Sequence, residues 1–349
     1  MLRIAVDAMG GDAGAPAVVE GVARLSCRAD NIHTLLVGHR DVLHSLLGQY
    51  RHDPSRIDVV HAPDFLPMGA DPHEVLERRP GASIRVATDL VAAGEAEALV
   101  SAGPTGGTVL AATARIGRLP GIRRAALAAV YPTEKTHGPR GDPFALILDV
   151  GATLGATADD LVGFAVMGSA YARIISGNPS PKVALLSNGA EANKGTPAIV
   201  AAHARLREHP FIDFSGNIEG IDIVRGTADV VVCDGFLGNV VLKMLEGVAE
   251  VLSGLMREAF DERLLWRVGL SLVGHDIRQI KAMTDWKQYG GAPLLGLERV
   301  VIKAHGRSNP RAFANAVRVA ARAVEGGLTE QIRLGLIESA RTEPQLRPS

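Results

Sequence analysis

The sequence is poor in cysteine, in excess charge and in long apolar runs. Its two cysteines, Cys27 and Cys233, form neither a CxxC motif nor a cluster at metal-ligand spacing, so we expect no disulfide framework. Its 37 Lys and Arg residues nearly balance 38 Asp and Glu residues, which argues against a generally basic surface that binds nucleic acid. No apolar run approaches about 18 residues without a charge, so no segment is expected to span a bilayer. These absences together favour a cytoplasmic protein.

The composition that remains is typical of close packing between helices and a sheet. Of the 349 residues, 47% are hydrophobic but only 4% are aromatic, and 39 are glycine. Short apolar runs alternate with helix-periodic segments, which predicts a doubly wound, mostly parallel α/β sheet with right-handed crossovers. The predicted strands are 3–7, 34–37, 57–61, 98–101, 127–131, 146–150, 182–186, 211–214, 230–234 and 300–303. The predicted helices are 16–25, 84–93, 108–116, 158–175, 197–207, 239–254 and 310–324.

The stretch from Ala228 to Lys243 is the most informative part of the chain. A buried strand over 230–234 ends in a turn with Gly235 and Gly238, and Asn239 opens an apolar-periodic helix. Such a strand–turn–helix directs free N–H groups and the positive helix end at one point, which suits phosphate or another oxyanion. The turn matches neither the GxGxxG nor the GxxxxGK[ST] pattern, so a dinucleotide or Walker-type site is not predicted.

Similar polar, glycine-bearing turns follow other predicted strands. Because ligands of open α/β sheets bind at the carboxyl ends of strands, we expect these turns to share one cleft. The turns are 7–12, 101–106, 149–153, 187–195 and 234–239.

Within the turns, several side chains and amides suit an anion. Lys194 stands near a helix start, where its charge does not help the helix dipole, so a ligand contact is favoured over a solvated lysine. In the 101–106 turn, Thr105 is as consistent with an N-cap as with a ligand contact. The predicted substrate-binding residues of these two turns are Ser101, Gly103, Thr105, Gly106, Ser187 and Asn188.

Other polar residues have a structural alternative. Asp7 and Asp12 flank Gly10 and Gly11, but no third carboxylate or histidine lies at ligand spacing, so we predict turn stabilisation and no metal site. Glu219, close to Asn217, is consistent with orienting Lys194, with contacting substrate or with facing water. Cys233 is expected to be an inert, buried thiol. His305 follows the last strand together with Lys303 and suits either a proton shuttle or a structural role.

Residues 251–289 combine dense apolar side chains with arginines. This composition is consistent with a projecting helical element that contacts a membrane surface or a partner subunit, or equally with a dimerisation or core helix. The residues predicted to make that contact are Leu264, Leu265, Trp266, Val268 and Leu270. We expect the rest of 1–342 to form one α/β domain, 133–143 to be a polar surface loop, and 343–349 to be a flexible tail.

With these motifs in place, the chain resembles the bacterial phosphate acyltransferases, which make acyl-phosphate from acyl–acyl carrier protein in phospholipid synthesis. The matching segments run in order along nearly the whole chain. They are 4–12, 100–103, 148–152, 164–171, 216–220, 230–243, 289–296 and 301–306.

The resemblance implies a three-layer α/β/α fold like those of phosphate acetyltransferases and isocitrate-dehydrogenase-like enzymes. It also implies a homodimer, peripheral association with the inner face of the bacterial membrane, and neither metal nor other cofactor. In the implied reaction, inorganic phosphate attacks the thioester of acyl–acyl carrier protein, and the enzyme positions the anion and stabilises the oxyanion. We predict that Lys194 and Asn239 donate hydrogen bonds to the phosphate and that Asp234 and His305 orient Lys194 or Lys303. Backbone amides near Gly103–Gly106 or Gly235–Gly238 are predicted to polarise the thioester carbonyl.

Three alternatives stay open. An acyl-CoA-dependent phosphate acetyltransferase shares the fold but needs no exposed apolar projection. A decarboxylating dehydrogenase would need an aspartate metal cluster and a nicotinamide site, and neither is found. Departures from the family pattern at Pro104, Ser187 and Ala192 fit a weakened scaffold that docks acyl carrier protein at the membrane. A downstream membrane glycerol-3-phosphate acyltransferase is a further expected partner.

Overall fold

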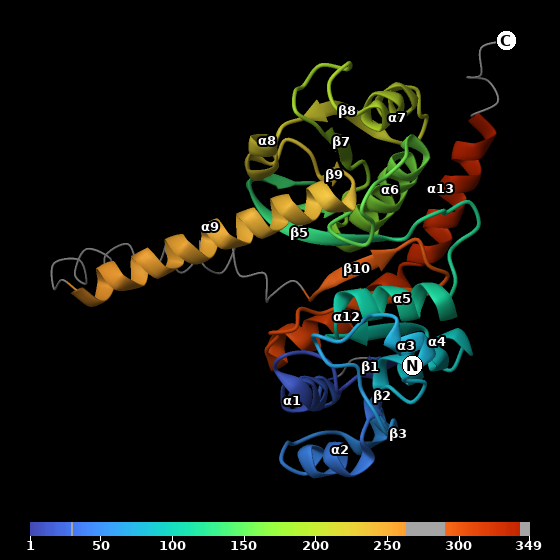
Figure 1. Cartoon of the computed structure of the whole chain (residues 1–349), viewed down its shortest axis with the longest axis vertical. Helices are drawn as coiled ribbons and strands as arrows, with labels where there is room; N and C mark the ends of the chain where they lie inside the picture. Colours follow the sequence, from blue (N-terminus) through green and yellow to red (C-terminus); the bar gives the residue numbers. More distant parts are fainter. Residues whose placement is uncertain (29–30, 263–289, 343–349) are drawn as a thin grey trace.

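A single eleven-stranded sheet forms the centre of the molecule in the computed structural model, which describes residues 1–28, 31–262 and 290–342. The strand order across the sheet is β3-β2-β1-β4-β11-β10-β5-β6-β9-β7-β8 (Figure 1). The strands are β1 (Leu2–Asp7), β2 (Ile32–Gly38), β3 (Ile57–His61), β4 (Ala98–Ser101), β5 (Ala126–His137), β6 (Asp142–Leu148), β7 (Lys182–Leu186), β8 (Asp213–Ile218), β9 (Val230–Val232), β10 (Ala292–Leu295) and β11 (Val300–Lys303).

The sheet consists of two parallel blocks that run in opposite directions. Strands β3, β2, β1, β4 and β11 are mutually parallel, and so are β6, β9, β7 and β8. Between the blocks, β10 is antiparallel to both β11 and β5, and β5 is antiparallel to β6. The prediction of a mostly parallel sheet is confirmed. The expectation that all five turns open at one edge is wrong, because the β5–β6 reversal sends the carboxyl ends of the two blocks toward opposite edges.

Helices cover both faces of the sheet, which gives the predicted three-layer arrangement. Alternate strand residues point to opposite faces, so Ile4 and Val6 join one core while Ala5 joins the other. The first core packs against α1 (Gly14–Ser26), α2 (Arg40–Leu47), α6 (Ala158–Tyr171), the π-helical turn η2 (Ala172–Ser176), α7 (Pro197–Arg207), α12 (Pro310–Glu325) and α13 (Leu328–Thr342). The second packs against α3 (Glu74–Glu77), α4 (Ser83–Ala92), α5 (Thr105–Arg115), α8 (Gly220–Arg225) and α9 (Gly235–Glu262); a short 3-10 turn, η1 (Pro54–Arg56), precedes β3.

The polar stretch 133–143 is the outer part of a β-hairpin rather than a loop. His137 pairs with Asp142 across a turn that contains Gly138 and Gly141, both at positive φ. The hairpin is fixed to the sheet because His137 Nδ1 lies 3.1 Å from Asp229 Oδ1. Composition misled the prediction here because this end of the hairpin extends beyond the apolar core.

Other boundaries also differ from the predictions. The strand predicted at 211–214 is β8, which runs over 213–218, and α9 begins four residues before Asn239. The elements α2, α3, α8, α13 and β10 were not predicted, since all are short or carry many exposed polar residues. The predicted contact residues 264–270 and the predicted tail 343–349 lie outside the described residues.

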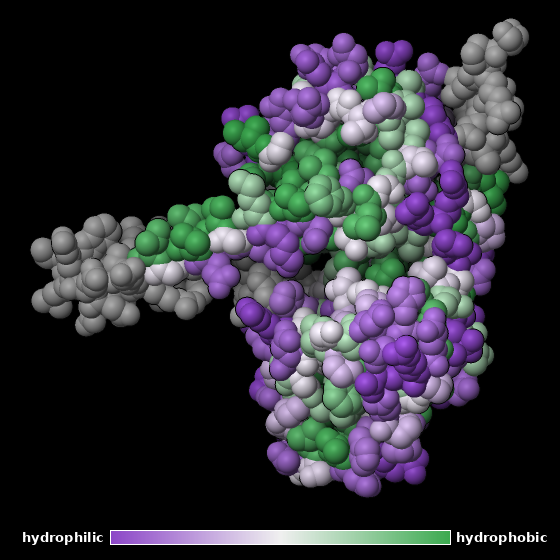
Figure 2. Space-filling model, viewed as in Figure 1, coloured by the Kyte–Doolittle hydropathy of each residue, from purple (hydrophilic) through white to green (hydrophobic). Residues whose placement is uncertain are grey.

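Helix α9 projects from the body of the molecule, and its outer part carries apolar side chains on its surface (Figures 1 and 2). Met244 is 69% exposed and Val251 is 62% exposed. Val240, Val248, Leu252 and Leu255 are each at least 50% exposed. Within the described ranges, no helix combines the length and apolarity needed to cross a bilayer.

Candidate functional site

Asp7 forms the centre of a buried polar cluster at the ends of β1 and β4. Its carboxylate accepts hydrogen bonds from Ser83 Oγ (2.6 Å) and Ser101 Oγ (2.7 Å), and more weakly from the Met9 amide (3.3 Å). Only 1% of Asp7 is exposed, and this burial raises the pKa of the carboxyl group although the hydrogen bonds oppose the rise. Ser83, at the start of α4, was not predicted as a site residue.

Glycines bring the turns after β1, β4 and β11 into contact. A Cβ on Gly10 would lie 2.6 Å from the Gly103 backbone and 2.8 Å from Asp7 Oδ2. Gly11 has φ +95°, and a Cβ on this residue would lie 3.0 Å from the Gly306 carbonyl oxygen. Larger residues would separate these turns, so the predicted residues Gly10, Gly11 and Gly103 permit the close approach of three backbones.

Lys303 lies beside Ser101 in register at the end of β11. It is 7% exposed, and its ammonium group donates to the Ala304 carbonyl. Burial lowers the pKa of Lys303 to about 8, although Asp7 and Asp12 partly oppose the shift. The group is therefore mainly charged at neutral pH and is an uncommon buried cation at a strand end.

Helix α5 begins next to this cluster and leaves its first amides unengaged. Its N-cap residue is Pro104, which makes no side-chain cap, so the alternative that Thr105 serves as N-cap is wrong. In the described part of the chain, the Thr105, Gly106 and Gly107 amides donate no hydrogen bond, whereas the Gly103 amide donates to Ser101 Oγ (3.0 Å). Three free N–H groups at a helix start favour an anion.

His305 follows Lys303 and is half-buried. Its Nδ1 accepts a hydrogen bond from the Arg307 amide (3.1 Å), which leaves the proton of the neutral ring on Nε2. Burial lowers the pKa of His305; nearby Glu246 of α9 opposes the shift, while Lys303 and Lys243 add to it. The middle of α9 thus lies within electrostatic reach of the β11 turn.

The start of α9 is built differently from that of α5. Asp234 Oδ1 accepts from the Phe236 and Leu237 amides (both 3.0 Å), and the Gly235 amide approaches Thr153 Oγ1 at 3.4 Å. The amides of this turn are therefore already engaged, and Asp234 caps the helix. Gly235 and Gly238 serve a close contact instead: a Cβ on Gly238 would lie 1.9 Å from the Asp149 carbonyl oxygen.

Asp149, at the end of β6, fixes the turn against which α9 starts. It is fully buried and accepts hydrogen bonds from the Leu127, Gly151, Ala152 and Thr153 amides and from Thr153 Oγ1. Burial raises the pKa of this carboxyl group. Asn239, exposed on the second turn of α9, lies over Gly151, whose ideal Cβ position is 3.6 Å from Asn239 Cγ.

The 187–195 turn lies at the same edge of the sheet as the start of α9. Asn217 supports it by donating from Nδ2 to the Glu191 carbonyl (2.8 Å), while Ser187 Oγ lies 3.5 Å from Asn188 Oδ1. Lys194 is exposed; its backbone amide donates to the Glu191 carbonyl (3.0 Å), and its side chain makes no hydrogen bond or ion pair to a described residue. Glu219 caps α8 in a capping box with Asp222. This structural role is compatible with the predicted alternatives, namely orienting Lys194, contacting substrate or facing water.

The predicted residues thus gather into two groups rather than one. The group at α5 contains Asp7, Gly10, Gly11, Ser101, Gly103, Thr105, Gly106, Lys303 and His305. The group at α9 contains Ser187, Asn188, Lys194, Asn217, Asp234, Gly235, Gly238 and Asn239. Half-buried apolar side chains of α5, of the sheet and of α9 pack against the second core, namely Val109, Leu110, Ala129, Tyr131, Ala292, Leu237, Val241 and Leu242. Figure 2 shows the surface hollowed between α9 and the lower half of the molecule.

Comparisons with known proteins agree with this architecture. The family model described as "Fatty acid synthesis protein" matches residues 2–331. The chain is 41% identical to a phosphate acyltransferase of Gloeobacter violaceus over 338 residues, which cover 96% of this chain and 97% of the relative. It is 40% identical to a phosphate acyltransferase of Nitratiruptor sp. over 338 residues, covering 97% and 98% of the two chains.

Solved structures show the same fold at low sequence identity. A phosphotransacetylase from Streptococcus pyogenes superposes with a TM-score of 0.61 at 19% identity, covering 93% of this chain and 94% of that one. The EutD phosphotransacetylase from Staphylococcus aureus gives 0.57 at 19% identity, covering 92% and 93%.

The chain therefore has the α/β fold of these phosphotransacetylase structures. More specifically, the chain belongs to the phosphate acyltransferase family and is an acyltransferase. The family resemblance, the fold class and the enzyme class inferred from the sequence are confirmed.

Proposed function

We propose that this acyltransferase moves a long-chain fatty acyl group reversibly from acyl–acyl carrier protein to inorganic phosphate, giving acyl-phosphate for phospholipid synthesis. The observation that carries the proposal is the group at α5, where free amides of Thr105, Gly106 and Gly107 stand near the buried cation of Lys303. Backbone donors and a buried positive charge can hold phosphate without a metal.

In the proposed reaction, a phosphate oxygen attacks the thioester carbonyl carbon, and the carbon–sulfur bond breaks. Hydrogen phosphate loses its proton as the acyl–oxygen bond forms, and the departing sulfur gains one. His305 suits this transfer because burial favours its neutral form, which can accept a proton and pass it on. The amides of α5 that do not hold phosphate would stabilise the oxyanion.

A second position for the attacking phosphate is defined by Lys194 and Asn239. The α5 position is favoured because the first backbone donors of α9 are already occupied, and because Lys194 and Asn239 are both exposed side chains. The half-buried apolar side chains of α5, of the sheet and of α9 suit the acyl chain.

The exposed apolar side chains of α9 support association with another surface. Val240, Met244 and Val248 recur every four residues, so they lie along one side of the projecting helix. We propose that this side takes part in a homodimer and in peripheral contact with the inner face of the membrane, where a downstream glycerol-3-phosphate acyltransferase would receive the product.

The direct test is incubation with palmitoyl–acyl carrier protein and phosphate, with acyl-phosphate trapped by hydroxylamine. Formation of palmitoyl hydroxamate that depends on both substrates supports the proposal. Preference for a short acyl-CoA donor would instead identify a phosphate acetyltransferase-like enzyme. Tight carrier binding without any hydroxamate would favour the scaffold alternative.

A further inference from the structure

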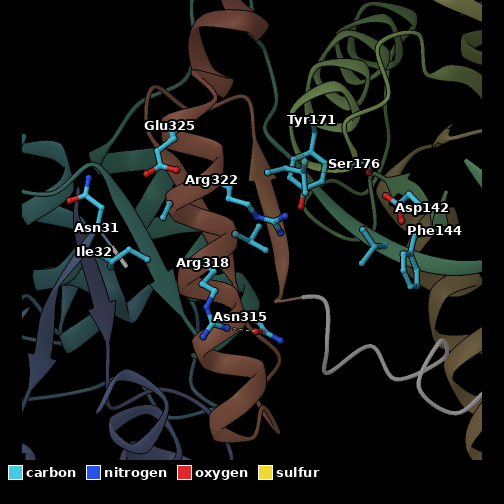
Figure 3. Close-up of a pocket in the computed structure, with 14 residues that line it drawn as sticks. Asn31, Ile32, Asp142, Phe144, Tyr171, Ser176, Asn315, Arg318, Arg322 and Glu325 are labelled. Carbon is cyan, nitrogen blue, oxygen red and sulfur yellow. Dashed lines mark hydrogen bonds between the residues drawn. The ribbon is translucent and has the colours of Figure 1, made fainter. Parts of the chain in front are cut away.

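A cavity of about 580 Å³ lies on the face of the sheet opposite to α5 and α9. Its walls come from α12, from the junction of α6 with η2, and from the first residues of β2 and the β5–β6 hairpin (Figure 3). It therefore lies between the two blocks of the sheet, a kind of position that small-molecule sites often occupy, and its volume falls in their range of roughly 300–1,000 Å³.

Tyr171 presents a polar group to this cavity without a protein partner. The residue is 2% exposed, and its hydroxyl makes no hydrogen bond to any described residue. Because this hydroxyl lines the cavity and has no described protein partner, it is free to donate its proton to a ligand or to solvent there.

Arg322 is the cation nearest to that hydroxyl. Its positive charge acts on Tyr171, and its guanidinium forms no hydrogen bond or ion pair within the described ranges. Figure 3 shows the guanidinium extending from α12 toward Tyr171 and Ser176. A phenolic donor and a guanidinium that converge on one space suit a carboxylate, whose two oxygens match the guanidinium fork.

The other residues that line the cavity indicate the charge of the ligand and its apolar part. Asp142 and Glu325 balance the charges of Arg318 and Arg322 in the walls, which favours a singly charged ligand over a phosphate monoester or a polyphosphate. Val130, Ile175 and Val319 add apolar surface that an inorganic ion cannot cover.

We propose that this cavity binds an aliphatic carboxylate, with its headgroup held by Tyr171 Oη and Arg322 and its chain against Val130, Ile175 and Val319. Because the α5–α9 face lies on the other side of the sheet, such a ligand would act apart from the proposed reaction site and leave it open to substrates.

The test is calorimetric titration of decanoate into the full chain and into two variants, Tyr171→Phe and Arg322→Gln. We expect each variant to bind decanoate at least about tenfold more weakly, since each removes one headgroup contact. The control Arg333→Gln, which changes an exposed arginine of α13 paired with Glu330, should bind like the wild type. Decanol, which has the same chain without charge, and inorganic phosphate should both bind more weakly than decanoate.

Two further readouts separate this site from others. Tyr171→Phe should keep the wild-type melting temperature in the absence of ligand, because the lost hydroxyl has no protein partner. Lys194→Ala should keep wild-type decanoate affinity, because Lys194 lies at the other site. Unchanged affinity in both cavity variants, equal binding of decanol, or loss of binding in Lys194→Ala would each overturn the proposal.

Discussion

Ser83 Oγ donates a 2.6 Å hydrogen bond to Asp7 Oδ1, although the two residues are 76 positions apart in the chain. The bond joins the start of α4 to the end of β1 and satisfies a carboxylate that is otherwise shut off from water. Because Ser101 occupies the other oxygen of the same carboxylate, Asp7 positions the β4 turn from which α5 starts.

Removing this contact should destabilise the protein. Ser83→Ala leaves one oxygen of a buried carboxylate without its strongest donor, which we expect to lower the free energy of unfolding by about 1–3 kcal/mol. Urea denaturation provides the measurement. Ser55→Ala is the matched control, because Ser55 Oγ makes a 2.7 Å bond to Asp53 at an exposed site, and its effect should stay within about 0.5 kcal/mol. Equal losses in the two variants would contradict the role given to Ser83.

Lys303 should make stability depend on pH in the alkaline range. Its pKa falls from 10.5 to about 8 on folding, so between these values the unfolded chain binds more protons than the native one. The free energy of unfolding should therefore rise with pH from about 8 to 10.5, by at most about 3 kcal/mol from this group. Denaturation series at several pH values should show this rise in the wild type and a flatter profile in Lys303→Met. Parallel profiles would argue against the depressed pKa.

The same group should set the pH dependence of phosphate binding. If the Lys303 ammonium holds phosphate, its loss of a proton above about pH 8 should raise the KM for phosphate. Lys303→Met should raise that KM below about pH 8 and remove its rise above pH 8, while the KM for the acyl donor changes little. Steady-state kinetics with the two substrates varied separately measure this difference, and a change confined to the acyl donor would place phosphate elsewhere.

Lys194 provides the contrasting test. If it contacts phosphate in the transition state, Lys194→Ala should lose well over ~10-fold in rate, since one such charge-assisted contact is worth about 2–3 kcal/mol. The exposed Lys135 of the hairpin is a suitable control, and Lys135→Ala should retain wild-type turnover. Wild-type turnover in Lys194→Ala would remove this residue from the mechanism.

The start of α9 should not tolerate any side chain at Gly238. An alanine Cβ there would lie 1.9 Å from the Asp149 carbonyl oxygen, so Gly238→Ala should cost about 1–3 kcal/mol or more as the helix shifts. On the same helix, nothing lies within 4 Å of the ideal Cβ of Gly247, and Gly247→Ala should stabilise by about 0.5–1 kcal/mol. Thermal unfolding of both variants gives the comparison, and equal shifts would contradict the tight contact.

Sequence periodicity predicted most of the sheet because its strands are buried on both faces. Strands such as 98–101 and 300–303 read as continuous apolar runs, and they were placed to the residue. Strand direction was not predictable in the same way. The hairpin that reverses the second block is polar beyond Tyr131, since it leaves the core there, and it was predicted to be a loop.

The site was predictable only as far as unusual residues cluster in turns. Asp7, Ser101 and Lys303 stand at strand ends and do meet. Ser83 begins a helix far away in sequence and carries no pattern of its own, so only the tertiary structure reveals it. The glycines of the α9 turn suggested free amides, but the engaged amides depend on Asp234 and Thr153, whose orientations a sequence does not determine.

Helix α9 has 28 residues, which corresponds to about 42 Å along its axis, and only its first turns are wedged against the Asp149 turn. A tilt of this rigid helix about the glycine contact would change the spacing between α9 and α5. If the outer part of α9 binds a partner or a membrane as proposed, that contact would therefore also affect the width available to an acyl chain.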